Sequence, residues 1–238
     1  MFDFNGTLSD DEPLLASIFA DALGRYGVRL SRERYYAELA GLSDAEIATR
    51  GLELHGGRAQ PGAVAEILAL RGELYRHRVA VASPLRPGAA GLVRALAARV
   101  PVGVVSGAQR ADVEAVLGAA GLLELLTVTI CAEDVRAGKP DPEGYLRALA
   151  ALAPPRADAV VAIEDSIPGI VAAKRPGMRC PAVRGTSPDK ALAARADRVL
   201  DDLHPALVAD LLGDCRPAPA SELPDDPDRV GYPESPRG

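Results

Sequence analysis

The sequence predicts an α/β fold, in which a parallel sheet is covered by helices on both faces and a helical unit is inserted near the start. Through the later part of the chain, short apolar runs alternate with helical patterns, which is typical of a sheet buried on both faces. Residues 10–82 instead contain amphipathic helical patterns and no convincing strand. The chain has 238 residues, which is enough for one large domain with such an insertion.

The predicted strands are short apolar runs bounded by Pro, Gly or polar residues. The first covers residues 1–4 and is shorter than the roughly five or six residues usual for a strand. The other predicted strands are 102–106, 127–131, 159–163, 179–183 and a short edge at 198–200. The helices predicted around them are 89–98, 110–120, 142–152, 168–174, 188–195 and 205–212.

Four helices are predicted within the insertion. Residues 12–26 place apolar side chains at helical spacing, and Pro61 suits the first turn of a helix over 61–79. A second helix begins at Ser31 and a third at Ser43. Glu46 follows Ser43 by three residues, which is the spacing of a capping box.

Composition argues against several classes of partner. The chain has 27 Lys and Arg against 33 Asp and Glu, a net charge of −6, so a globally basic nucleic-acid binder or polybasic membrane protein is not expected. No apolar run reaches the roughly 18 residues of a membrane span, and the first residues do not read as a signal peptide. Three distant cysteines favour neither a disulfide framework nor a zinc site, so a reducing, cytoplasmic location is expected.

The end of the chain differs in character from the rest. Residues 216–238 are rich in Pro and acidic residues and poor in apolar ones, so we expect a disordered tail.

Four polar segments stand at the ends of predicted strands. They are 3–8 (DFNGTL), 106–107 (SG), 138–142 (GKPDP) and 164–166 (EDS). Because the carboxyl ends of parallel strands form the ligand crevice, we expect all four to converge. Each alone has an ordinary interpretation: a turn at Asn5, a helix N-cap at Ser106 completed by Gln109, a surface loop at Lys139, or an acidic helix start at Glu164.

The order and content of these segments resemble the haloacid dehalogenase superfamily. The similarity is greatest to its subfamily with a helical cap inserted after the first motif, which includes phosphoglycolate-type phosphatases and β-phosphoglucomutases. The family's third and fourth motifs are matched closely by GKPDP and by EDSIPGIVAAK. The resemblance covers residues 1 to about 202 and implies a Rossmann-like core at 1–9 and 83–215 with a helical-bundle cap at 10–82.

The resemblance also implies a chemistry. Asp3 would attack phosphorus and become an aspartyl-phosphate, while Mg²⁺ relieves the repulsion between the carboxylate and the phosphate. The implied substrate is a small phosphorylated metabolite. Apart from the resemblance, we expect a monomer, because the helical cap can bury its own apolar faces, and the composition already argues against a nucleic-acid or membrane partner. The implied metal ligands are Asp3, the backbone carbonyl of Asn5 and Asp165, with Glu164 close by. The groups implied to act on the phosphoryl group are Asp3, Lys139, Ser106, Gly107 and Thr7.

Asn5 departs from the family's first motif, D-x-D-G-T. The second Asp of that motif protonates the leaving group and then activates water, and an Asn amide can do neither. Turnover is therefore expected to fall by roughly 10²–10⁴-fold. Three explanations stay open: an acid–base group from elsewhere, such as Glu12, Asp11 or the substrate; an engineered Asp→Asn trap; or a binding protein that has lost catalysis.

The loop at 41–46 resembles the family's substrate-specificity loop. Sugar-phosphate mutases carry an Arg directly after its Ser, where this chain has Asp44, which weakens the mutase alternative. Glu12, Ser43 and Arg110 are the candidate substrate contacts. The sequence therefore predicts a Mg²⁺-dependent phosphatase impaired by Asn5, with a mutase or a silent phosphometabolite-binding protein as alternatives. Carbon–halogen hydrolysis is disfavoured because it does not need the acidic pair at 164–165.

Overall fold

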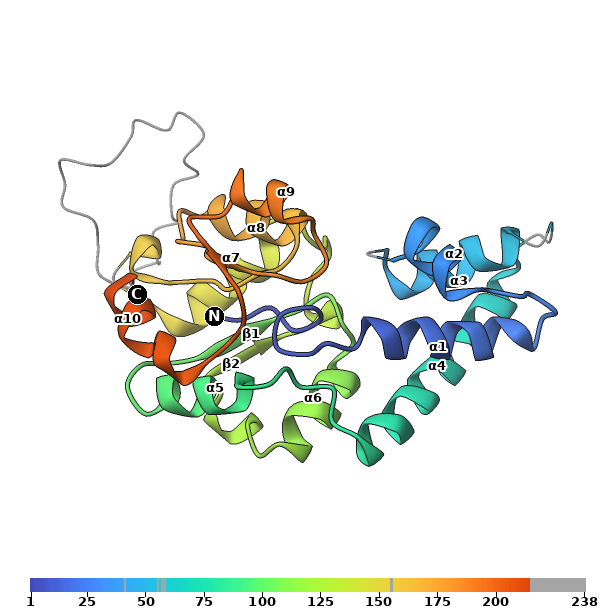
Figure 1. Ribbon diagram of the computed structural model, residues 1–238, viewed down its shortest axis with the longest axis horizontal. Coiled ribbons are helices and arrows are strands. Elements are labelled where there is room, and N and C mark those ends of the chain that lie inside the picture. The colour runs from blue at the N-terminus through green and yellow to red at the C-terminus, as the bar shows by residue number, and fades with distance from the viewer. Residues whose placement is uncertain (41, 55, 57–58, 155, 215–238) are drawn as a thin grey trace, which may run out of the picture.

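The structure, a computed structural model, describes residues 1–40, 42–54, 56, 59–154 and 156–214. Figure 1 shows an α/β core on one side and a helical unit on the other, joined by the long helices α1 and α4. The predicted α/β fold with a parallel sheet and a helical cap is confirmed. The predicted disordered tail at 216–238 lies outside the described residues.

Two short parallel ladders form the flanks of the sheet. Strand β1 (Gly103–Val105) pairs with β2 (Val128–Ile130), with Gly103 opposite Val128. Strand β3 (Ala182–Val183) pairs with β4 (Val199–Leu200) in the same parallel sense.

The first residues of the chain lie between these two ladders. Phe2 makes parallel bridges to Val104 on one side and to Ile163 on the other, and Glu164 bridges Ala182. The order across the sheet is therefore β2, β1, residues 1–3, residues 161–164, β3 and β4, with all segments parallel. The segment that ends at Asp3 is central, which places this residue in the middle of the carboxyl edge.

Two predicted strands are shorter than expected. Residues 157–159 form a 3₁₀ turn, closed by the Val160 N–H on the Ala157 carbonyl, and 161–164 then pair through isolated bridges. In the next segment Arg179 makes one bridge and the ladder resumes only at β3. Pro181 precedes β3 and has no N–H to contribute, which accounts for the interruption.

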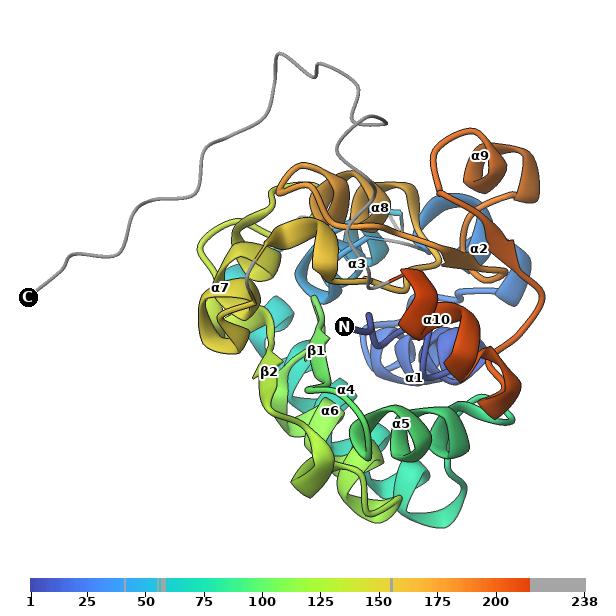
Figure 2. The ribbon, with the colours of Figure 1, turned by 90° about the vertical axis from the view of Figure 1, so that its left-hand side faces the viewer.

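Helices cover both faces of the sheet (Figure 2). Successive strand residues point to opposite faces, so Val104 joins the apolar cluster that includes Phe2, whereas Val105 joins the cluster that includes Tyr145. The core helices are α5 (Ala89–Ala97), α6 (Arg110–Ala119), α7 (Glu143–Leu152), α8 (Ile167–Lys174), α9 (Asp189–Ala193) and α10 (Val208–Asp214). The other 3₁₀ turns are Leu123–Leu125, Ala132–Asp134 and Pro205–Leu207.

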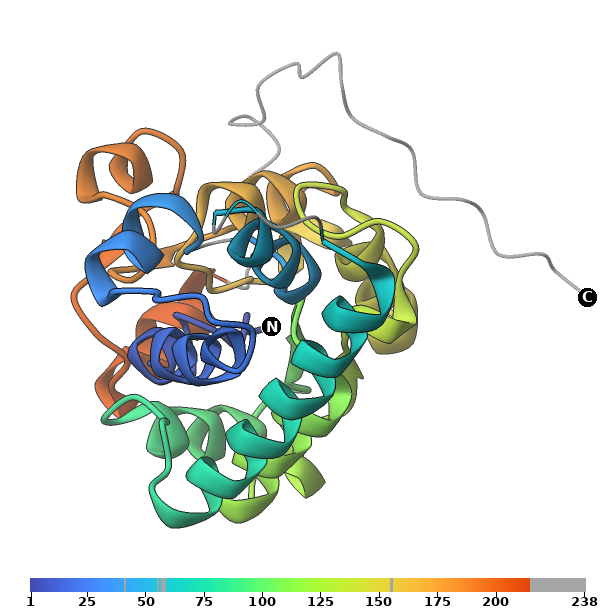
Figure 3. The ribbon, with the colours of Figure 1, turned by 90° about the vertical axis from the view of Figure 1, so that its right-hand side faces the viewer.

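The cap consists of the four predicted helices: α1 (Glu12–Gly24), α2 (Arg32–Glu38), α3 (Asp44–Glu53) and α4 (Pro61–Val81). The predicted capping box at Ser43 is present, because its hydroxyl accepts from the Glu46 N–H and Glu46 accepts from the Ser43 N–H. Figure 3 shows α1 and α4 end-on and obliquely from the cap side, and α4 also packs on α6 of the core. In the part of the chain that the structure describes, no helix is long and apolar enough to cross a membrane.

Candidate active site

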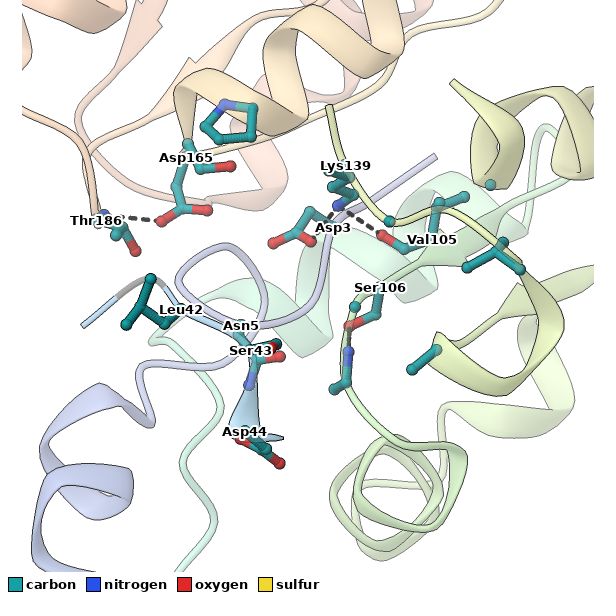
Figure 4. Close-up of a pocket in the computed structure, with 18 of the residues that line it drawn as sticks. Asp3, Asn5, Leu42, Ser43, Asp44, Val105, Ser106, Lys139, Asp165 and Thr186 are labelled. Carbon is teal, nitrogen blue, oxygen red and sulfur yellow. Dashed lines mark hydrogen bonds and ion pairs between the residues drawn. The ribbon is translucent and has the colours of Figure 1, made fainter. Parts of the chain in front are cut away.

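Lys139 holds together two carboxylates at the carboxyl edge of the sheet. Its Nζ donates to Asp3 Oδ1 at 2.5 Å, to Glu164 Oε1 at 2.6 Å and to the Val105 carbonyl at 2.9 Å. Figure 4 shows the bonds from Lys139 to Asp3 and Val105. Partial burial lowers the pKa of Lys139, but these carboxylates outweigh it and raise the pKa above its usual value, so the ammonium stays charged. Three of the four predicted segments thus meet at one cation.

Asp3 is buried but opens onto a cavity. Its Oδ1 accepts from Lys139, while its Oδ2 has no hydrogen-bond partner among the described residues. Burial raises the pKa of Asp3 well above its usual range against the opposing effect of Lys139, and the carboxylates of Glu164 and Asp165 raise it further. A further cation beside Asp3 would relieve this accumulation of negative charge.

Asp165 is fixed through both of its oxygens. Oδ1 accepts from the Thr7 hydroxyl at 3.2 Å, and Oδ2 accepts from the Thr186 N–H at 2.8 Å. Gly6 lies against this carboxylate with a φ of +79°, and a Cβ there would be 2.1 Å from Asp165 Oδ2, so only glycine fits. The prediction that Thr7 binds phosphate differs from the structure: Thr7 is fully buried, does not line the cavity and donates to Asp165.

Glu164 lies behind the cavity rather than in its wall. Its Oε1 accepts from Lys139 and from the Tyr145 hydroxyl at 2.7 Å, and its Oε2 accepts from the Ser166 hydroxyl at 3.2 Å. It is fully buried. Its hydrogen bonds therefore hold Lys139 in position toward Asp3.

The residues present fit a divalent cation. Carboxylate oxygens of Asp3, Glu164 and Asp165 lie within 4.8 Å of one another, and only Lys139 balances them at close range among the described residues. The backbone carbonyl of Asn5 accepts no hydrogen bond from any of the described residues, so it is available to a metal ion. An all-oxygen donor set of this kind suits Mg²⁺, which is held by few carboxylates and keeps several waters.

Ser106 and Gly107 line the cavity beyond β1. The Ser106 hydroxyl accepts from the Ala108 N–H at 2.9 Å, which leaves its own O–H free to donate toward the cavity. The alternative interpretation of Ser106 as a helix N-cap is wrong, because α6 begins at Arg110 with Gln109 as its N-cap.

Asn5 is tied to a buried carboxyl. Its side-chain amide donates to Asp11 Oδ2 at 2.8 Å, and the Tyr75 hydroxyl donates to the same oxygen at 2.6 Å. Burial raises the pKa of Asp11, whose Oδ1 has no hydrogen-bond partner among the described residues. Asn5 lines the cavity and Asp11 does not, so the side chain that faces the cavity at this point has no titratable proton.

A cavity of about 660 Å³ lies between the core edge and the cap. Glu12 of α1 and Ser43 at the start of α3 line it, and their roles as substrate contacts stay predictions. Arg110 does not line it: its guanidinium donates to Asp134 at 2.5 Å and to the Thr129 carbonyl at 3.2 Å. The prediction of Arg110 as a substrate contact therefore differs from the structure.

Four residues of this region were not predicted. Thr186 and Tyr145 fix the carboxylates of Asp165 and Glu164, and Tyr35 and Arg71 line the cavity from the cap. Arg71, an Arg within an apolar stretch of a predicted helix, is the one with a sequence signal; the partners of the others depend on the tertiary fold.

Comparison with known proteins agrees with this geometry. Residues 1–177 match the haloacid dehalogenase-like hydrolase family. The chain is 48% identical over 105 residues to validoxylamine A 7'-phosphate phosphatase of Streptomyces hygroscopicus subsp. limoneus, covering 44% of this chain and 48% of that protein. It is 30% identical over 205 residues to the bifunctional riboflavin kinase/FMN phosphatase of Arabidopsis thaliana, covering 85% and 52%. The matches span about half the length of these two relatives.

A solved structure is similar over nearly its whole length. The crystal structure of CbbY from Rhodobacter sphaeroides in complex with phosphate has a TM-score of 0.75 and 32% identity, covering 84% of this chain and 92% of that one. An Asp-to-Asn variant of the same protein, solved with xylulose-1,5-bisphosphate, matches equally well.

Proposed function

The chain belongs to the haloacid dehalogenase-like hydrolase family, and on this premise we propose that it is a Mg²⁺-dependent phosphatase of a small phosphorylated metabolite. The observation that carries the proposal is Asp3, with one oxygen held by Lys139 and the other facing the cavity. The relatives named as phosphatases are named for validoxylamine A 7'-phosphate and for FMN, which supports a small phosphorylated substrate.

Asp3 is the proposed nucleophile. Its free oxygen attacks phosphorus, the bond from phosphorus to the ester oxygen breaks, and the phosphoryl group is carried as an aspartyl-phosphate. Water then attacks phosphorus, which releases inorganic phosphate and regenerates the carboxylate. Lys139 fixes Asp3 in the attacking position, and Ser106 donates a hydrogen bond to the phosphoryl oxygens, so most of the rate enhancement comes from positioning and electrostatics.

Mg²⁺ would be held by Asp3, Asp165 and the Asn5 carbonyl, with Glu164 behind them. When bound, it supplies positive charge that offsets repulsion between the Asp3 carboxylate and the phosphate. Thr7, Thr186 and Gly6 keep the Asp165 carboxylate in place for this role.

Asn5 limits both steps. A sugar alkoxide leaving from phosphorus needs a proton, and the attacking water must lose one, but the Asn5 amide can exchange neither. Its amide instead donates to Asp11. This observation also favours a second candidate function, a phosphometabolite-binding protein without turnover.

The test compares the chain with its Asn5→Asp variant in a phosphate-release assay with Mg²⁺ on a panel of sugar phosphates. We expect Asn5→Asp to raise turnover by about 10²-fold or more. Binding without hydrolysis in both proteins would contradict the phosphatase and leave the binding protein. Isomerised sugar phosphate without free phosphate would instead identify a mutase, although Asp44 stands where such enzymes carry an Arg.

A further inference from the structure

The cap wall of the cavity differs in chemistry from the core wall. It is formed by side chains of all four cap helices or their starts: Glu12, Tyr35, Ser43, Asp44 and Arg71. Figure 4 shows Leu42, Ser43 and Asp44 on the opposite side from Lys139. A substrate with its phosphate at Asp3 would therefore extend its remote end toward these cap side chains.

Arg71 does not make this wall positive. Its Nε lies 3.1 Å from Asp44 Oδ2, its Nη1 donates to Asp112 of α6, and the residue is 3% exposed. Its single charge is matched by these two carboxylates, and Glu12 adds a third carboxyl group to the wall. Among the described residues that line the cap side, negative groups therefore outnumber positive ones.

Two buried polar groups of this wall lie against each other. Tyr35 is 1% exposed, and burial raises the pKa of its hydroxyl, with further contributions from the charge of Glu12 and from a side-chain hydrogen bond to it. Among the described residues, neither the Tyr35 hydroxyl nor Glu12 Oε1 has any other hydrogen-bond partner. Both oxygens keep lone pairs that a hydrogen-bond donor of a ligand can use.

We propose that the cap wall selects monophosphates whose remote end carries hydroxyl groups or an amine, and disfavours a second phosphate. Hydroxyls and ammonium groups can donate to Glu12, to Asp44 and to the oxygen of the Tyr35 hydroxyl, and a ligand hydroxyl can also accept a hydrogen bond. A second phosphate would face the carboxylates of Glu12 and Asp44, and among the described residues that line this wall Arg71 is the sole cation and is already paired. The inference rests on the proposed function and narrows its substrate class.

An alternative binding mode would place the second phosphate of a bisphosphate at Arg136. This exposed residue lines the cavity from the core loop after β2, and its guanidinium has no bonded partner among the described residues. A bisphosphate held there would avoid the cap wall. Arg136→Ala therefore separates the two arrangements.

The experiment measures kcat/KM for glucosamine 6-phosphate, glucose 6-phosphate and fructose 1,6-bisphosphate with Mg²⁺, in the Asn5→Asp background so that turnover is measurable. We expect both monophosphates to exceed the bisphosphate by at least about tenfold. Asp44→Arg should shift this ratio about tenfold toward the bisphosphate, mainly through KM. Glu53→Arg, on the same helix but outside the cavity, is the control and should leave the ratio unchanged.

Calorimetric measurement of the affinity of the unaltered chain for the same three compounds distinguishes failure of the substrate preference from failure of the proposed phosphatase. A preference for the bisphosphate that Arg136→Ala removes would overturn the inference and leave the phosphatase intact. Equal affinity for all three would also overturn it. If the unaltered chain binds both monophosphates more tightly than the bisphosphate, but neither this chain nor Asn5→Asp hydrolyses any of them, the inference is supported and the phosphatase is rejected. If none of the three compounds binds, both are overturned.

Discussion

Replacing Lys139 with Met tests the arrangement of the site without any substrate. The substitution keeps an unbranched side chain but removes the charge and three hydrogen bonds, to Asp3, Glu164 and the Val105 carbonyl. Removing one partner of a buried ion pair costs about 3–5 kcal/mol of unfolding free energy. Protonation of the unpaired carboxylate sets an upper limit on this cost. A carboxyl with an unfolded pKa near 4 can be protonated at a cost of about 1.4 kcal/mol for each unit by which the pH exceeds that pKa.

This limit gives the loss a pH dependence with a definite sign. The pKa of Asp3 is already raised in the folded protein, and loss of Lys139 raises it further. A carboxyl with a raised folded pKa destabilises the protein at pH values above its unfolded pKa, and the penalty disappears as the pH falls toward about 4. The loss should therefore be about 4 kcal/mol at pH 7 and about 1–2 kcal/mol at pH 5.

Urea denaturation in EDTA at the two pH values measures this loss. The matched control is Lys174→Met, since Lys174 makes an exposed ion pair with Asp197 at 2.6 Å that is worth about 1 kcal/mol or less. A Lys139→Met protein that is as stable as the unaltered chain at pH 7, or whose loss does not change with pH, would refute this account of the site.

Three further predictions concern the supports of the site. Mg²⁺ at 100 times its Kd should raise the free energy of unfolding by about 2.7 kcal/mol, measured as a higher unfolding midpoint. Asp165→Asn should abolish most of this gain, and an undiminished gain in the variant would contradict the assigned metal site. Hydrogen bonds from Arg147 and from the N–H groups of Ala137 and Arg136 lower the pKa of Glu143 to about 2. The two backbone bonds also shape the loop that carries Lys139. The stabilisation is therefore present above pH 4.5 and lost toward pH 2; an NMR titration midpoint near 4.5 would argue against these bonds. Asp112→Asn weakens the ion pair between α6 and Arg71 of the cap, so it should cost about 1.5–3 kcal/mol in urea denaturation, against little change for the exposed control Glu114→Gln.

Much of the site could be predicted because its residues follow apolar runs. Asp3, Lys139 and Asp165 each stand just beyond a buried segment or in a loop rich in Pro and Gly, and parallel topology then brings such positions to one edge. The strand lengths were less predictable, since pairing at 161–164 is limited by the 3₁₀ turn before it and Pro181 interrupts its neighbour.

Side-chain direction is what the sequence could not supply. Thr7 follows Gly6 and could face either way; the turn at Gly6 directs its hydroxyl to Asp165 instead of the cavity. Arg110 begins a helix near the site, but Asp134 and the Thr129 carbonyl hold its guanidinium away. Tyr35 enters the wall because α2 packs across α1, a contact between elements that no local pattern reveals.

The central claim is that Asp3 receives the phosphoryl group and that Asn5 slows its release. It is tested most directly with p-nitrophenyl phosphate and Mg²⁺, because nitrophenolate leaves without needing a proton from the enzyme. We expect a burst of about one nitrophenolate per chain followed by slow turnover. Mass spectrometry should then find one phosphoryl group on the peptide that contains Asp3. Asn5→Asp should replace the burst with steady turnover, and Asp3→Asn should abolish both. A chain that gains no phosphoryl group, or an Asp3→Asn variant that still releases nitrophenolate, would contradict the account.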